Sequence, residues 1–194
     1  LLVTLVRPVP AQSPARICIG PTSVETAVSN AVAASAVRET FGSFLTGPGL
    51  STTPLESRLV SQARVEARTA GCGYLLLTTI KHERRSSGGG LLGRITGAAV
   101  QQTASSVGTS VRSTTGRIVA NAAGSAATAA VSDYASGTRS QDALSLTTRL
   151  ERADGTVVLE KRDQRKAKSD GEDLLTPLVQ QHAEQVAVVV TRNP

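Results

Sequence analysis

The chain has 194 residues, a net charge of +6 and an apolar fraction of 40%, which fits one domain or one domain with an insertion. Aromatic residues make up only 2% of it, so a reader of single-stranded nucleic acid built on aromatic stacking is disfavoured, and we do not expect nucleic acid as a partner. The two His and two Cys lack the paired spacing of a zinc site, and we expect no metal or other cofactor.

The first 14 residues combine a short apolar run with prolines and small side chains. Val9 and Ala11 stand three and one residues before a signal-peptidase cut ahead of Gln12. This pattern predicts export to the periplasm or the extracellular space, and a disordered or strand-like arm is the alternative. No other stretch has the ~18 uninterrupted apolar residues that a spanning helix requires.

The next elements are a strand and a helix. Residues 16–20 read as a short buried strand that Gly20 and Pro21 end. Thr22 and Glu25 have the spacing of a capping box, which predicts a helix from there to Leu45, ended by the Gly- and Pro-containing residues 46–49.

A second helix is predicted from Thr53 as N-cap, with Pro54 and Glu56 in its first turn and Gly71 after its end. Its apolar residues fall on one stripe and are expected to face inward. They are Leu55, Leu59, Ala63, Ala67 and Ala70. The apolar run 74–80 then predicts a strand covered on both faces.

Cys18 and Cys72 lie on or beside these two neighbouring strands. They are therefore predicted to form either a disulfide or two buried thiols, because the sequence does not supply the separation of their Cα atoms.

After an insertion, Leu144, Leu146, Thr148 and Leu150 alternate with polar residues, as in a half-buried strand. Asp154 and Gly155 predict a hairpin turn, after which Val157 and Leu159 continue the inward register. The last helix is predicted to begin at Thr176 with Pro177 in its first turn; a start at Ser169, with Glu172 completing a capping box, is the alternative. The expected fold is α/β, a mixed sheet of about four strands with helices packed on it, formed by residues 15–86 and 141–194.

Residues 87–140 differ from the rest, since two thirds of them are Gly, Ala, Ser or Thr. Their apolar residues mostly recur three, four or seven positions apart, which favours helices, with a break at residues 112–116. A helical hairpin that packs on itself, on another copy or on a membrane surface is predicted. A flexible linker is the alternative, and arginines such as Arg94 and Arg112 argue against a membrane-spanning hairpin.

Small residues let helices approach closely, and one set of residues in the insertion fits such contacts between copies. The predicted assembly contacts are Gly89, Gly93, Gly97, Val107, Val111 and Ile118.

Motifs of catalysis and nucleotide binding are weak. Residues 88–93 match G-x-G-x-x-G, but a basic run separates them from the strand and no acidic residue follows until Asp133. His182 falls near the inner side of the last helix and is expected to be packed, whereas His82 lies in a basic run and is expected to be solvated. We predict no catalytic residue; an enzyme or nucleotide-binding protein using the Gly-rich segment is the alternative function.

Two basic runs, residues 81–85 and 161–168, raise the isoelectric point. Neighbouring Asp and Glu balance the second run, which predicts a solvated strand face. Binding of polyanions through the more basic residues 1–140 is a further alternative.

The strand RICIGP, the helix ending RETFGSFL, the segment EARTAGCGYLLLTTI and the later Asp-Gly hairpin together resemble an envelope domain of the curli-secretion channel and TolB amino-terminal type. The resemblance covers residues 15–80 and 141–191. It implies an exported, non-enzymatic module that assembles with itself or with an envelope partner, in some members with an insertion placed in a membrane.

Overall fold

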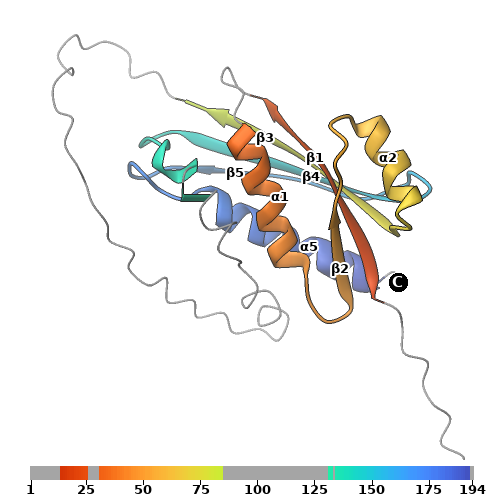
Figure 1. Cartoon of the computed structure of the whole chain (residues 1–194). Coiled ribbons are helices and arrows are strands. Elements are labelled where there is room, and N and C mark those ends of the chain that lie inside the picture. Colours follow the sequence, from red (N-terminus) through yellow and green to blue (C-terminus); the bar gives the residue numbers. More distant parts are fainter. Residues whose placement is uncertain (1–13, 26–30, 85–130, 133, 193–194) are drawn as a thin grey trace, which may run out of the picture.

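The computed structural model describes residues 14–25, 31–84, 131–132 and 134–192 (Figure 1). Within these residues the structure has five strands and three long helices, and residues 131–132 and 134–136 are also helical. In chain order the strands and long helices are β1 (Ala15–Glu25), α1 (Ala31–Leu45), β2 (Leu50–Pro54), α2 (Val60–Thr69), β3 (Tyr74–Glu83), β4 (Ala143–Arg152), β5 (Val157–Lys166) and α5 (Leu175–Arg192). Residues 1–13 of the predicted amino-terminal arm and residues 87–130 and 133 of the predicted insertion lie outside the described residues.

The strands form one mixed sheet in the order β2-β1-β3-β4-β5. β1 pairs in parallel with β2 and β3, and β3, β4 and β5 pair antiparallel in turn. The predicted α/β class is confirmed. β2 is the strand that the sequence pattern missed, because its five residues are mostly Ser, Thr and Pro.

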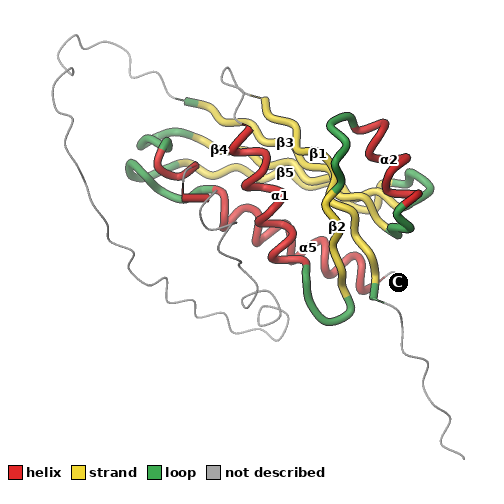
Figure 2. The backbone as a smooth tube through the Cα atoms, viewed as in Figure 1, coloured by secondary structure: helices red, strands yellow, loops and turns green. Residues whose placement is uncertain are grey.

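Helices cover the two faces of the sheet unequally (Figures 1 and 2). α1 and α5 pack side by side on one face, over the main core, which includes Phe41, Leu146 and Val186. α2 lies on the other face over a second, smaller core, which includes Ala63 and Leu75. We call these the α1/α5 face and the α2 face.

The prediction that Gly20 and Pro21 end the first strand was wrong, and so was a helix starting at Thr22. β1 continues to Glu25, with a register shift against β3 between Ile19 and Thr22. Pro21 lacks an N–H, and such an irregular position in a sheet tolerates it. Beyond the shift, pairing with β3 outweighs the capping signal: Thr22 Oγ1 lies 2.7 Å from Thr78 Oγ1.

The predicted start of the second helix at Thr53 was also wrong. Thr53 and Pro54 pair with β1, and α2 begins at Val60. The N–H groups of residues 56 and 57, which lie before the helix, donate to the Glu66 carboxylate at 3.1 Å. Because α2 begins only at Val60, Leu59, which was predicted to face inward, lies before the helix and is 58% exposed.

The remaining features of that segment follow the sequence. Leu55, Ala63 and Ala67 are buried as predicted, and α1 ends at Leu45. Gly71 has a φ of +68° directly after the end of α2. A left-handed residue at this position is the common way to end a helix.

The second half matches its pattern closely. Leu144, Leu146, Thr148 and Leu150 are buried along β4, and Gly155 takes a φ of +91° in the hairpin turn. One prediction failed: Val157 is 38% exposed, because the register shifts between Leu150 and Glu151.

α5 begins at Leu175, one residue before the predicted Thr176, and Pro177 lies in its first turn. Asp173 caps this helix, since its Oδ1 accepts the N–H groups of Leu175 and Thr176 at 2.9 and 3.0 Å. The alternative start at Ser169 is wrong; that residue belongs to a turn in which its N–H donates to Glu172.

Candidate functional site

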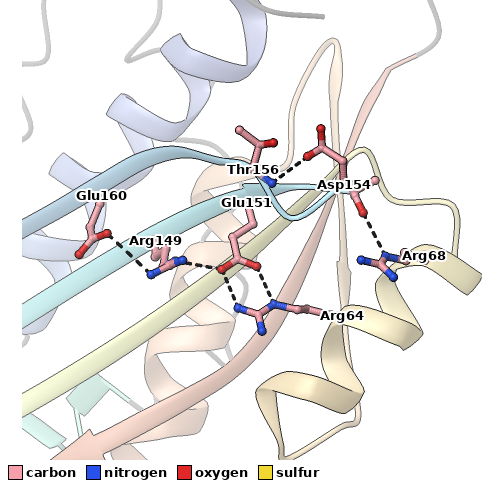
Figure 3. Close-up of polar contacts among 8 residues, drawn as sticks. Arg64, Arg68, Arg149, Glu151, Asp154, Thr156 and Glu160 are labelled. Atoms are coloured by element: carbon pink, nitrogen blue, oxygen red, sulfur yellow. Dashed lines mark hydrogen bonds and ion pairs between the residues drawn. The ribbon is translucent and has the colours of Figure 1, made fainter.

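The main polar cluster of the α2 face lies between α2 and β4 (Figure 3). Glu151 is only 1% exposed, and Arg64 of α2 donates to its two carboxylate oxygens, from Nε at 2.8 Å and from Nη2 at 2.9 Å. Arg149 Nε donates to the same carboxylate at 2.9 Å, while Arg149 Nη1 lies 3.9 Å from Glu160. One buried carboxylate therefore orients two guanidinium groups.

Charge states follow from these contacts. The hydrogen bond from Arg64, more than any other contact, lowers the pKa of Glu151, and the same hydrogen bond raises the pKa of Arg64. Burial opposes both shifts and is outweighed. Glu151 thus stays ionised at neutral pH, although almost none of it reaches solvent.

One further contact joins α2 to the β4–β5 hairpin, and another lies within the hairpin turn. Arg68 Nε donates to the carbonyl of Ala153 at 3.0 Å, and Asp154 Oδ1 accepts the N–H of Thr156 at 2.8 Å (Figure 3). That backbone hydrogen bond lowers the pKa of Asp154. The hairpin turn and α2 consequently form one polar unit at this end of the sheet.

His182 lies on the α1/α5 face in a second polar cluster. Its Nδ1 is 2.7 Å from Thr148 Oγ1, and its Nε2 is 3.0 Å from Asp163 Oδ2. The order acid, imidazole and hydroxyl is that of a nucleophile triad, but His182 and Thr148 are both 0% exposed. No substrate can reach the hydroxyl in this arrangement, and His182 is packed as the sequence predicted.

The prediction that His82 is solvated was wrong. Its side chain is 10% exposed, and its Nε2 lies 3.3 Å from the buried Asp142 carboxylate. Its ring also lies 5.8 Å from that of Tyr134, centroid to centroid, and burial raises the pKa of Tyr134. Tyr134 falls inside the predicted insertion, so the last part of that segment contributes a side chain to the main core.

Cys18 and Cys72 form a disulfide, the first of the two alternatives, with 5.7 Å between their Cα atoms. It joins β1 to the residues just before β3, and both cysteines are buried in the second core. The remaining predicted site residues lie outside the described residues. They are Gly89, Gly93, Gly97, Val107, Val111 and Ile118, and the G-x-G-x-x-G match at 88–93 lies there with them.

No family model matches the sequence, and no curated protein matches it. Solved structures do match its fold. Two of them are PelC dodecamers from Paraburkholderia phytofirmans, one of them a point variant, each with 11% sequence identity and a TM-score of 0.50. Each alignment covers 93% of this chain and 91% of the PelC chain. At this identity the likeness shows a shared fold.

The described helices include none that is long and apolar enough to cross a bilayer. Within the same residues, no three His, Cys, Asp or Glu side chains group as metal ligands.

Sequence reasoning missed the cluster around Glu151. The alternation of β4 does place Arg149 and Glu151 on the face opposite its leucines, but a charged residue there normally points to solvent. The neighbouring strand could have predicted the burial of Glu151. Glu151 lies opposite Leu75 of β3, a strand that was predicted to be covered on both faces, so its carboxylate had to be buried with a cationic partner.

Proposed function

We propose that this chain is a non-enzymatic domain that is exported to the cell envelope and assembles there with copies of itself. The observation that carries the proposal is the fold likeness to PelC dodecamers over 93% of the chain. The resemblance of the sequence to self-assembling envelope domains supports the same role.

The disulfide supports the compartment. Disulfides persist in the periplasm and outside the cell, and they are rare in the reducing cytosol. Cys18 and Cys72 are 0% and 3% exposed, so this bridge is part of the packed core. The signal-like residues before Gln12 agree with export.

Two surfaces are proposed as contacts between copies. The first is the small-residue set Gly89, Gly93, Gly97, Val107, Val111 and Ile118. The second is the outer side of α2 and the residues before it, where Leu59 and Val65 are 58% and 62% exposed. Exposed apolar side chains that lie together are typical of interaction sites. An envelope protein or a membrane surface is the alternative partner for either surface.

Size-exclusion chromatography with light scattering on the full chain tests assembly, with and without vesicles of anionic lipid. One variant carries Gly89→Leu, Gly93→Leu and Gly97→Leu, which replaces the small side chains proposed to form contacts between copies. A second carries Leu59→Ser and Val65→Ser, which removes the apolar side chains of α2. We expect an oligomer that at least one variant dissociates, whereas a monomer at every protein concentration contradicts the proposal.

A further inference from the structure

A concave pocket of about 300 Å³ opens on the α2 face, beside the polar cluster of Glu151. The sheet contributes hydroxyl groups to its lining, from Ser23, Thr79 and Thr147. Arg64 and Arg149 contribute guanidinium groups from two different elements. We call this hollow the arginine pocket. It is separate from the apolar surface of α2 proposed above for assembly.

Charges in the arginine pocket do not cancel at close range. Arg64 and Arg149 both donate to Glu151, whose single negative charge balances one of them. The other carboxylate that lines the pocket, Glu160, is 3.9 Å from Arg149 Nη1, beyond hydrogen-bond distance, and its side chain is 61% exposed. The second positive charge is therefore balanced only by a solvated carboxylate that makes no hydrogen bond to it.

Hydrogen-bond donors also remain available. A guanidinium has five N–H groups, and Arg64 uses two of its nitrogens on Glu151, while Arg149 uses one. The side chains are 43% exposed on both arginines, so their remaining N–H groups reach solvent. Val60, the first residue of α2, lines the same pocket, and no side chain caps that helix end. The helix terminus thus adds positive potential on the same side.

We propose that the arginine pocket binds one oxyanion group, a carboxylate or a phosphate. The planar fork of a guanidinium matches both groups, and a fixed guanidinium loses little side-chain freedom on binding. Glu151 fixes both forks in advance. The bound oxyanion takes the place of the Glu160 carboxylate at Arg149. It also accepts hydrogen bonds from the hydroxyl groups of the sheet residues that line the pocket. This binding goes beyond the proposed assembly and does not depend on it.

The test is an NMR titration of the full chain with sodium acetate or sodium phosphate at constant ionic strength, observing the Nε–H signals of arginine. We expect saturable shifts of the Arg64 and Arg149 signals with at least one anion. Shifts with acetate alone indicate a carboxylate ligand, and shifts with phosphate alone indicate a phosphate ligand. Shifts with both anions show that the pocket accepts either group.

Three variants make the result specific. Arg149→Gln is expected to weaken the affinity about tenfold, and Glu160→Gln, which removes the competing carboxylate, to strengthen it severalfold. Arg165→Gln changes the net charge equally at an exposed position of β5 away from the pocket, and should leave the affinity unchanged. Shifts that never saturate, or equal weakening by Arg149→Gln and Arg165→Gln, overturn the proposal. Glu160 is exposed, so Glu160→Gln is expected to fold normally. Its affinity therefore tests the proposal even if Arg149→Gln folds poorly.

Discussion

The two faces of the sheet are stabilised in different ways. The α1/α5 face buries large aliphatic and aromatic side chains, among them Phe41, Leu146 and Leu178. On the α2 face the helix contributes mainly Ala63 and Ala67. The disulfide of Cys72, which follows the helix, and the ion pair between Arg64 and Glu151 join this part of the chain to the sheet. Apolar area therefore stabilises one face, whereas covalent and charged links compensate for the small apolar area of the other.

The largest effect is expected on the α1/α5 face, from Phe41→Ala. Phe41 is 0% exposed and belongs to the main core. Truncation loses the transfer free energy of the ring and leaves a cavity, so unfolding in urea should show a loss of about 4 kcal/mol. Phe44→Ala is the matched control, since Phe44 only packs against that core and is half-buried. Equal losses from the two variants would contradict the comparison.

The α2 face should respond most to loss of the disulfide. The double variant Cys18→Ala and Cys72→Ala opens a link between residues separated by 54 positions and should lose about 3 kcal/mol in urea unfolding.

A reducing agent provides the control for this prediction. It should destabilise the native chain by a similar amount and leave the double variant unchanged, while the loss from Phe41→Ala stays the same with and without it. If the reducing agent left the free energy of unfolding of the native chain unchanged, the bridge would not stabilise the α2 face.

Glu151→Gln should cost about 2 kcal/mol at neutral pH, since it removes the charge shared by Arg64 and Arg149 from a buried position. Because contacts in the folded chain lower the pKa of Glu151, its contribution is complete above the ordinary range of a glutamate and disappears as the pH falls through the lowered value. The stability gap between native chain and variant should therefore close in acid. A gap that stays constant between pH 7 and pH 3 would show that the charge is not the cause.

His182, on the α1/α5 face, should make the stability of the folded chain depend on pH in a second way. Burial lowers its pKa, although the Asp163 carboxylate acts in the other direction and the Lys161 charge adds to the lowering. The unfolded chain then binds a proton more readily, so stability is complete above the ordinary histidine pKa of about 6.5 and decreases as the pH falls below it.

His182→Gln should flatten this dependence between pH 7 and pH 5 and cost about 1 kcal/mol at pH 7, because the hydrogen bond to Thr148 is altered. Thermal unfolding at a series of pH values measures both effects. An unchanged slope would assign the pH dependence to another group.

The contrast between the faces also explains what the sequence could predict. Alternation in β4, the Asp-Gly turn and the apolar stripe of α5 are local patterns, and each produced the expected element. The wrong starts at Thr22 and Thr53 were decided by pairing with β3 and β1, which are distant in sequence. A local capping signal contributes about 1 kcal/mol, and several strand hydrogen bonds outweigh it.

The candidate site was harder to predict for the same reason. Glu151 and Arg64 are 87 residues apart, and each looks like a solvated surface residue within its own element. Their pairing follows from α2 packing on β1 and β3, which brings Arg64 within reach of the neighbouring strand β4, and no short-range pattern reports this packing. The disulfide was accessible to reasoning because its two cysteines flank strands that the sequence placed side by side.

Gly42→Ala should have the smallest effect and the opposite sign. Gly42 lies inside α1, where glycine costs up to 1 kcal/mol relative to alanine. A Cβ there would lie 3.7 Å from Ile19 Cδ1, an ordinary van der Waals contact, so a gain of about 0.5 kcal/mol is expected in urea unfolding. Gly20→Ala is the matched control, because its Cβ would lie 2.8 Å from Leu77 Cδ2 and 3.2 Å from the Leu76 carbonyl oxygen. Gly20 faces the second core, so Gly20→Ala should destabilise the protein. If both glycines tolerate alanine equally, the close packing inferred between β1 and β3 under α2 is wrong, and the disulfide and ion pairs alone fix that face.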